Sequence, residues 1–320
     1  MPVISVITPV WNGLPYLRQA AESALGQEFD DWEWIISDDG STDGSIQYLL
    51  SLQEASDGLV RFFAQSKNLG IFGNLNFLTS QAHSSLIQIL CQDDYFTSPD
   101  TLACLFAKWK SLPSSIGASR WNSSSLDCAV GLGERIDPLS SQLLFFLNGN
   151  IPGNLSNVAF RKAAWINVGP FDQRFPYAGD FYYWALFAKS FSIVLLPENG
   201  VYIRQHPTQA SCLLNKVGEL YPQLSEVSSE IYKRIPQKGW LSDFSLRIAG
   251  TLVYDCGYRR GLMMRALGRG SARYRSFLRS SSGKAYLVHP FLKWLLMFAT
   301  LGGALGKKII LSLAYKLNVN

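Results

Sequence analysis

Strand-like and helix-like segments alternate along the first hundred residues of this 320-residue chain. Short apolar runs rich in β-branched or aromatic residues predict strands at residues 3–8, 32–37, 60–64 and 86–90. Apolar residues at helical spacing predict helices at residues 14–25, after the possible cap at 41–43 through residue 52, at 70–82 and from 99 to about 109. Such repeated units are typical of an α/β fold, an open and mostly parallel sheet with helices on both faces. Ligands bind beyond the carboxyl ends of these strands, so residues 9–12, 38–41 and 92–94 are expected on one rim.

The pattern weakens between residues 111 and 157, which are rich in Ser, Gly and Asn and are predicted as loops with a short helix at 143–147. Regular elements return as strands at residues 156–160, 193–196 and 201–204, and as helices at 161–168 and 180–190. After about residue 212 the pattern is helical to the end. Two domains are therefore expected, residues 1–212 and a helical, basic C-terminal extension over residues 213–320.

Charge divides the chain at a similar place. Residues 1–230 contain 13 Lys and Arg against 22 Asp and Glu, whereas residues 231–320 contain 16 against two, which gives −9 and +14. A basic tail of this kind favours an anionic surface. Nine Trp, 19 Phe and 14 Tyr exclude an intrinsically disordered chain.

Five scattered cysteines without a CxxC spacing argue against a disulfide framework and against a zinc site. The first residues lack a basic region and are predicted as a strand rather than a signal peptide. Both features favour a cytosolic protein.

Two acidic segments follow predicted strands. In Asp38–Asp43, carboxylates can accept hydrogen bonds from a base or a ribose, although an N-cap with a turn explains this segment equally well. Asp93 and Asp94 are adjacent carboxylates, which repel one another unless a cation lies between them and a ligand. Hard oxygen ligands suit Mg²⁺ or Mn²⁺ at a diphosphate, and a solvated turn is the alternative interpretation.

Two later residues are further candidates. Asp180 begins an aromatic helix, where a carboxylate with a raised pKa could act as a general base, or simply cap the helix. His206 follows a predicted strand and could complete a metal or phosphate site, while a structural role is the more common one for a single histidine.

Taken together and in this order, the motifs resemble those of the family 2 glycosyltransferases, nucleotide-sugar-dependent enzymes with a GT-A fold. The resemblance spans roughly residues 3–210. It rests on the segments 3–12, 36–43, 68–70, 74–76, 93–94, 99–100, 160–161, 169–172, 180 and 204–206. It implies a Rossmann-like sheet with a donor half over about 1–110 and an acceptor half over about 111–212.

The resemblance also implies roles for individual residues. Pro9 and Trp11 would line the nucleobase pocket, with Trp11 stacked on the base. Asp38 would hydrogen-bond the base and Asp93 the ribose or sugar. The implied sites are therefore nucleotide-sugar binding at Pro9, Trp11, Asp38, Asn68 and Asp93, metal binding at Asp94 and His206, and a catalytic base at Asp180.

The implied activity is an inverting, metal-dependent transfer of a sugar from a nucleoside diphosphate, with UDP favoured, to a glycan or lipid-linked hydroxyl in cell-surface polysaccharide assembly. The chain departs from the family pattern at two places. The acidic motif at residues 91–94 lacks an earlier Asp that many members have. Gly179 stands where the family usually has Glu, which leaves the choice of acceptor open. The competing hypothesis is a catalytically inactive nucleotide-sugar-binding or regulatory protein. A nucleotidyltransferase is disfavoured because residues 9–17 contain no Gly-rich basic loop.

The basic tail is expected to associate with an anionic membrane surface through residues 259–316. Thirteen uncharged residues, 294–306, are too few to span a bilayer, which takes about 20. Packing on the catalytic domain or in a homodimer interface is the alternative, and nucleic-acid binding has no supporting motif. These features predict a cytoplasmic protein, peripheral at the inner face of the membrane.

Overall fold

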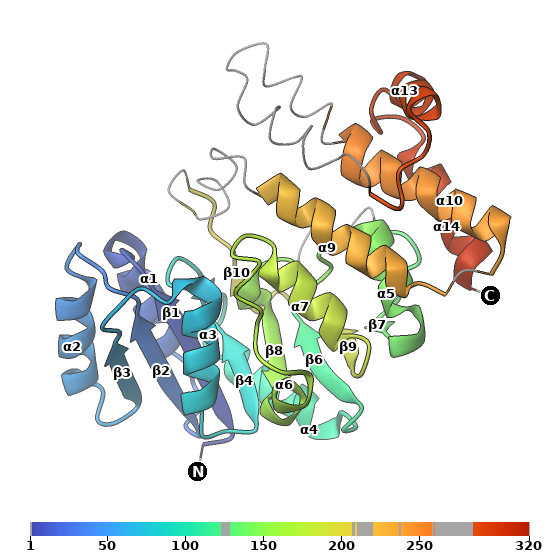
Figure 1. Ribbon diagram of the computed structural model, residues 1–320. Helices are drawn as coiled ribbons and strands as arrows, with labels where there is room; N and C mark the ends of the chain where they lie inside the picture. Colours follow the sequence, from blue (N-terminus) through green and yellow to red (C-terminus); the bar gives the residue numbers. More distant parts are fainter. Residues whose placement is uncertain are drawn as a thin grey trace. The chain divides into compact units, whose positions relative to one another are not determined.

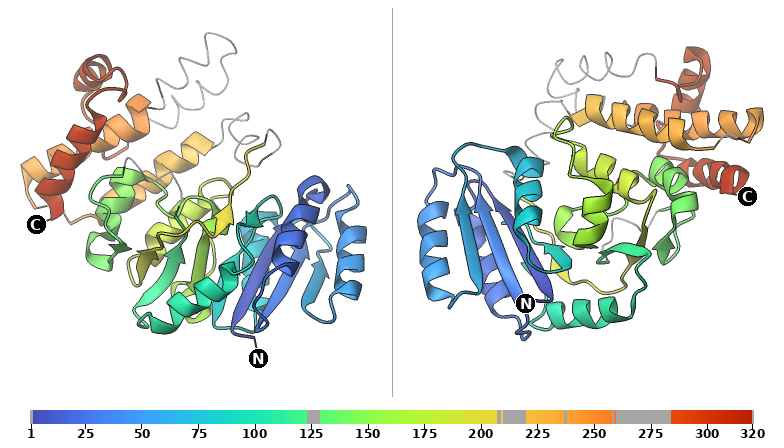
Figure 2. Two further views of the ribbon diagram at one scale, coloured as in Figure 1. Left: turned by 180° about the vertical axis from the view of Figure 1, so that it is seen from behind. Right: turned by 60° about the horizontal axis from the view of Figure 1, so that its bottom comes forward.

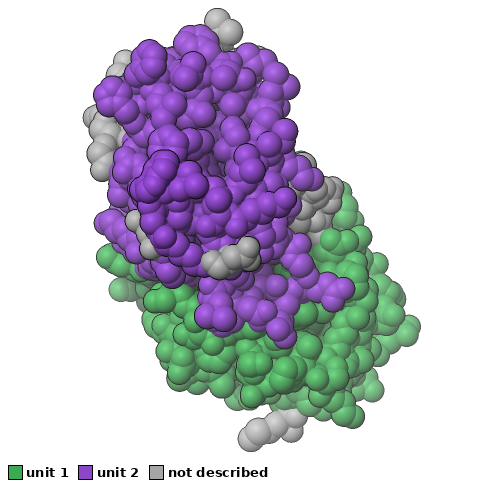
Figure 3. Space-filling view, turned by 90° about the vertical axis from the view of Figure 1, so that its right-hand side faces the viewer, with its two compact units in different colours: residues 1–124, 152–205 green, residues 125–151, 206–320 purple. Residues whose placement is uncertain are grey.

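A mixed β-sheet is the framework of the N-terminal part of the computed structural model, which describes residues 2–122, 129–206, 209, 220–236, 238–257, 259 and 284–319 (Figure 1). The chain forms two units, residues 1–124 with 152–205 and residues 125–151 with 206–320 (Figure 3). The second unit thus includes residues 125–151, which the expected domain division had grouped with the N-terminal domain. The assignment of residues 1–212 as a catalytic domain and 213–320 as its extension stays a prediction.

In the first unit, strands follow the order β3-β2-β1-β4-β8-β6-β9. Their bounds are β1 Ile4–Val10, β2 Trp32–Asp38, β3 Val60–Ala64, β4 Leu86–Ile89, β6 Ile116–Arg120, β8 Val158–Arg161 and β9 Ser192–Leu195. Strands β1 to β4 pair in parallel, as does β6 with β9, whereas β8 runs antiparallel to both β4 and β6. The short strands β5, Tyr95–Phe96, and β10, Val201–Tyr202, form a separate antiparallel pair. The expected mostly parallel sheet is confirmed.

Helices cover both faces of this sheet (Figures 1 and 2). Their bounds are α1 Leu14–Leu25, α2 Ser45–Ala55, α3 Gly70–Gln81, α4 Thr101–Ser111, α6 Lys162–Val168 and α7 Gly179–Phe187, with a 3-10 turn at Leu155–Asn157. Alternate residues of β1, Ile4, Val6 and Val10, share one hydrophobic core with α1, α2 and α4. The pleat points successive side chains to opposite faces. Helices α3 and α7 lie on the other face (Figure 2).

Several predicted bounds are corrected. Helix α2 begins at Ser45 behind Gly44, which adopts a φ of 93° and has no side chain to cap the helix. Asp43 supplies the cap from one position earlier, since its Oδ1 accepts from the N–H of Ser45 at 3.0 Å. Strand β6 lies where loops were expected. It contains Gly117, where a Cβ would come within 2.5 Å of the Cβ of Phe191. The buried Arg120 guanidinium ends the strand and donates to the carbonyl oxygen of Pro152, at 3.0 Å.

The described part of the second unit is mainly helical, as expected. It contains β7 Arg135–Ile136, α5 Pro138–Asn148, α9 Leu220–Arg234, α10 Trp240–Thr251, a π-helical segment Leu252–Cys256, α13 Pro290–Ala299 and α14 Lys307–Val319. Its core includes Phe146, whose ring lies 5.5–5.8 Å from those of Tyr232, Tyr254 and Tyr286. Within the described ranges, no helix has the length and apolarity needed to cross a membrane.

Candidate active site

Two loops meet at the carboxyl ends of β1 and β2 and are held together by side chains. The backbone N–H of Asn12 donates to Ser41 Oγ at 2.7 Å, and that of Thr42 donates to Asn12 Oδ1 at 2.8 Å. Asp43 Oδ2 accepts from the N–H of Leu14 at 3.0 Å. Asn12 adopts a φ of 49°, a left-handed conformation that asparagine tolerates well. The sheet rule therefore brings residues 9–12 and 38–43 together as expected.

Asp38 is fully buried at the end of β2, and its two oxygens differ. Oδ1 accepts from the backbone N–H groups of Gly40 at 3.0 Å and Ser41 at 2.7 Å. Oδ2 has no hydrogen-bond partner among the described residues. A buried acceptor without a partner is costly, and an N–H of a ligand would satisfy it. Because the residue is buried, a base could reach Oδ2 only after neighbouring groups move.

The adjacent Asp39 has a structural task that the sequence did not reveal. Its Oδ1 accepts from the N–H of Leu69 at 2.7 Å, and its Oδ2 accepts from that of Gly70 at 2.9 Å, at the start of α3. Asn68 Nδ2 donates to the backbone oxygen of Asp39 at 3.0 Å, and Asn68 Oδ1 accepts from Gly70. Asn68 thus stabilises this turn; its nucleotide-binding role stays a prediction.

Gln92 connects the first rim loop to the acidic turn. Its Oε1 accepts from the N–H of Trp11 at 2.7 Å, and its Nε2 donates to the Trp11 carbonyl at 3.1 Å. A Cβ on Gly13 would lie 2.3 Å from Gln92 Oε1, so a larger residue there would displace the Gln92 amide from its contacts with Trp11. The Trp11 side chain remains 53% exposed and offers a ring face for stacking, whereas Pro9 is buried in β1 opposite Ser37.

Asp94 is the buried member of the acidic pair, and Asp93 is half-buried. Asp94 Oδ2 accepts from Ser156 Oγ at 2.6 Å, and Oδ1 accepts from the backbone N–H of Arg204 at 3.0 Å. Burial raises the pKa of Asp94 to about 7, and the negative charge of Asp93 acts in the same direction, against these hydrogen bonds. The Arg204 guanidinium donates from Nε to the Asp93 carbonyl at 2.9 Å.

Asp94 and its neighbours suit a divalent metal ion whose remaining coordination positions are filled by the phosphates of a bound nucleotide and by water. Among the described residues, no group of three or more His, Cys, Asp or Glu side chains could hold a metal ion by itself. Mg²⁺ and ions like it are commonly bound by one or two carboxylates together with substrate phosphates and water. The Asp94 oxygens keep further lone pairs, and a nearby cation would remove the cost of its buried charge. His206 belongs to the second unit, so its metal role stays a prediction.

Asp180 lies in the first turn of α7, and its Oδ1 accepts from the N–H of Phe181 at 2.8 Å. The N-cap position is occupied by Ala178, so the alternative of Asp180 as the cap is wrong. The preceding Gly179 is buried, and a Cβ there would come within 2.6 Å of the Phe72 ring on α3. The structure thus gives a physical reason for glycine at this position: the Phe72 ring occupies the space of its side chain.

The loop before α7 is fastened to α3 by a reciprocal pair. Asn76 Nδ2 donates to the Phe171 carbonyl at 2.9 Å, and Asn76 Oδ1 accepts from the Phe171 N–H at 2.8 Å. The Phe171 ring stacks on Tyr183 with 3.9 Å between centroids. Because α3 begins at the turn held by Asp39, this helix links the rim to the segment that carries Asp180.

Sequence reasoning missed three contributors to this site. Ser156 lies at the start of a predicted strand with no sign of a polar role, and it both donates to Asp94 and accepts from the N–H of Cys91, at 2.8 Å. Gln92 was expected on the rim, but its two hydrogen bonds to the Trp11 backbone were not. Arg204 was part of a quoted motif, but its contact with the acidic turn spans 110 residues and depends on tertiary structure.

The comparisons with known proteins agree with this geometry. Residues 5–173 match the model of the family described as glycosyl transferase family 2. Over 98 residues, 31% of the chain, it is 36% identical to the GalNAc(5)-diNAcBac-PP-undecaprenol beta-1,3-glucosyltransferase of Campylobacter jejuni, of which the match covers 32%. Over 102 residues, 32% of the chain, it is 36% identical to the chondroitin synthase of Escherichia coli, of which the match covers 14%. The chain therefore matches about a third or less of these relatives.

Solved structures share the fold over nearly the whole chain. S. aureus TarS 1–349 in complex with UDP-GlcNAc has a TM-score of 0.65 at 15% identity, covering 98% of this chain and 91% of that one. The mannosyltransferase PcManGT from Pyrobaculum calidifontis, in complex with GDP-Man and Mn²⁺, has a TM-score of 0.58 at 16% identity, covering 98% and 87%. At these identities the likeness shows the fold, which is GT-A.

Proposed function

Because the chain belongs to glycosyl transferase family 2, we propose that it transfers a sugar from a nucleoside diphosphate donor to a hydroxyl group with inversion at the anomeric carbon. A UDP-sugar is the proposed donor, and a glycan or lipid-linked molecule in cell-surface polysaccharide assembly is the proposed acceptor. The names of two relatives support this acceptor class, since one name includes undecaprenol, a lipid carrier, and the other includes chondroitin, a polysaccharide.

The donor is proposed to bind along the rim of the first unit. The exposed Trp11 ring stacks on the base, beside Pro9, and Gln92 holds the Trp11 backbone in place. Asp38 Oδ2 accepts a hydrogen bond from the base, which its lack of a partner supports. Asp93 contacts the ribose or sugar from its half-buried position, and Asn68 shapes the neighbouring turn.

The diphosphate is proposed to lie at Asp94, which would hold Mg²⁺ or Mn²⁺, with His206 as a further ligand. A bound divalent ion would supply Lewis-acid stabilisation of the charge that develops on the departing diphosphate. The chain contributes the orientation of the carboxylate, because Ser156 and the Arg204 backbone each fix one Asp94 oxygen. It also contributes burial, which strengthens electrostatic interactions there.

Asp180 is proposed as the catalytic base. Its carboxylate accepts the proton of the acceptor hydroxyl while that oxygen forms a bond to the anomeric carbon. The bond between this carbon and the diphosphate oxygen breaks, and the nucleoside diphosphate leaves with the electron pair. Attack opposite the leaving group inverts the configuration. The first turn of α7 suits this task, since the positive end of the helix dipole favours an ionised carboxylate.

The observation that carries the proposal is the buried, oriented Asp94 carboxylate beside Asp93. Its test is the release of nucleoside diphosphate from nucleotide sugars by the full chain with Mn²⁺, Mg²⁺ or EDTA. We expect metal-dependent release that Asp94→Asn abolishes and that the exposed control Asp100→Asn leaves unchanged. Binding of a nucleotide sugar without any turnover would instead favour the inactive regulatory protein.

We further propose the division of labour expected from the sequence, with residues 1–212 as the catalytic domain and 213–320 as an extension that sets location. The protein would then act in the cytoplasm, at the inner face of the membrane.

A further inference from the structure

Helix α13 has an inverted distribution of polar and apolar residues. Its most exposed side chains are aromatic or aliphatic, with Phe291 at 76% and Phe298 at 73%, accompanied by Trp294 and Leu295. None of its residues is buried, yet its one charged side chain, Lys293, is only 18% exposed. A surface helix of a globular protein normally turns its charged face to water. This helix presents its apolar face instead.

Contacts within the second unit hold α13 in this orientation. The buried Asp255 carboxylate accepts from Arg259 Nε at 2.9 Å, and Lys293 Nζ lies 3.9 Å from its other oxygen. The Arg259 guanidinium also lies over the Trp294 ring, 5.8 Å from its centroid. Turning Lys293 outward would leave the buried carboxylate with one cation fewer, which is costly. The exposed apolar face is therefore built into the packing of this unit.

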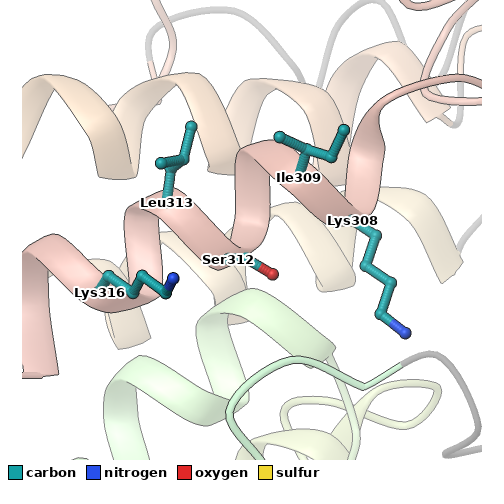
Figure 4. Close-up of a pocket in the computed structure, with 5 residues that line it drawn as sticks. All are labelled: Lys308, Ile309, Ser312, Leu313 and Lys316. Atoms are coloured by element: carbon teal, nitrogen blue, oxygen red, sulfur yellow. The ribbon is translucent and has the colours of Figure 1, made fainter.

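The apolar exposure continues beyond the helix and is accompanied by positive charge. Leu301 and Leu305 are both more than half exposed in the loop after α13, and Lys307 and Lys308 follow at once. Residues 284–320 contain five lysines and no carboxylate. On α14, an open pocket of about 300 Å³ is lined by apolar and basic side chains, and in Figure 4 Ile309 and Leu313 point to one side of the helix while Lys308 and Lys316 point to the other. The lining residues are Lys308, Ile309, Ser312, Leu313 and Lys316.

We propose that α13 and the loop through Leu305 form an interfacial anchor that inserts its apolar face into a membrane rich in anionic lipid. The ten residues of α13 are about 15 Å long, too short to span a bilayer but suited to lie in its interface. Charge complementarity favours anionic lipid over a second copy of the chain, because two copies would bring lysines together without a carboxylate from this segment. The anchor is independent of the chemistry proposed for the rim.

Vesicle co-sedimentation of the full-length protein tests this anchor without any need for turnover. We expect binding to vesicles of phosphatidylcholine with 30% phosphatidylglycerol, about an order of magnitude weaker binding to phosphatidylcholine alone, and weakening by salt. The double variant Phe291→Ser/Phe298→Ser should lower the partition coefficient at least about tenfold. The matched control is Ile166→Ser, which replaces a side chain 65% exposed on α6 of the first unit and should bind like the wild type.

Tryptophan quenching by brominated anionic lipid locates the insertion. Trp294→Phe should remove most of the quenching, while Trp240→Phe, at a position 79% exposed on α10, should retain it. Vesicle binding that is unaffected by the Phe291/Phe298 pair, or quenching that is unaffected by Trp294→Phe, overturns the proposal. A third outcome also overturns it: without lipid, light scattering shows that the wild type is a dimer and the Phe291/Phe298 variant a monomer, and the wild type does not bind vesicles.

Discussion

Replacing Asp94 with asparagine should stabilise the metal-free protein at neutral and alkaline pH. The substitution keeps the shape of the side chain and can retain the hydrogen bonds to Ser156 and to the Arg204 backbone. What it removes is a negative charge that is buried in the turn between β4 and β5 and lies beside Asp93. In the wild type, burial raises the pKa of Asp94 from 3.8 to about 7.

The size of the effect follows from this shift. A pKa raised by roughly 3 units corresponds to about 4 kcal/mol, since each unit is 1.36 kcal/mol. Well below pH 3.8 the carboxyl is protonated in both the folded and the unfolded chain, and its stabilising contribution is fully present. As pH rises towards 7 the unfolded chain ionises first, so this contribution to the free energy of unfolding is lost. Above pH 7 the loss is complete.

The assay is urea denaturation of the wild type and Asp94→Asn in EDTA between pH 4 and 8. The advantage of the variant should grow with pH and level off above about 7, by up to about 4 kcal/mol. Asp172→Asn is the control, because Arg174 lowers the pKa of Asp172 below its ordinary value of 3.8. Its stabilising contribution is lost only as pH falls below that value, so the difference between the wild type and this variant should stay nearly constant over the assay. A difference between wild type and Asp94→Asn that does not change with pH would refute the reasoning.

Three further substitutions test other parts of the site. Asp180→Asn should lower turnover by at least about a hundredfold while nucleotide binding measured by calorimetry is retained; unchanged turnover would remove Asp180 as the base. Gly179→Ala should cost about 1–3 kcal/mol in thermal unfolding, because its Cβ would lie 2.6 Å from the Phe72 ring, and its cost should be smaller in a Phe72→Ala background than in the wild type; an unaltered melting temperature would contradict this contact. Asp38→Asn should weaken nucleotide affinity about tenfold without changing the metal dependence, and equal affinity would show that the base does not use Oδ2.

The alternation of apolar runs and helical repeats was sufficient for most of the first unit. Helix α1 and strand β3 have the bounds that the pattern predicts, because local periodicity matches the packing of each segment on the sheet. Strand β6 was missed because Gly117 and Arg120 are poor strand formers by themselves. Gly117 is required by the Cβ of Phe191 and the ring of Phe187, and Arg120 is fixed by a carbonyl 32 residues away.

The sequence was sufficient to predict which residues lie together at the carboxyl ends of the strands, but not which role each carboxylate has there. Topology places Asp38, Asp39 and the acidic turn at strand ends, so their neighbourhood follows from sequence. Which carboxylate caps α3 and which keeps an oxygen without a partner depends on the path of the chain at Asn68, and sequence gives no measure of it. The apolar face of α13 shows the same limit, since its orientation depends on tertiary contacts of Lys293 with Asp255 and of Trp294 with Arg259.

The most direct measurement of the central claim is the thermal shift of the full-length protein with UDP-, GDP- and dTDP-sugars in Mn²⁺ and in EDTA. We expect stabilisation that is greatest for UDP-sugars, requires the metal and disappears in Asp94→Asn. The Asp100→Asn control should behave as the wild type. If no nucleotide sugar stabilises the protein with Mn²⁺, or if stabilisation is equal in EDTA and in Asp94→Asn, the proposed donor site is contradicted.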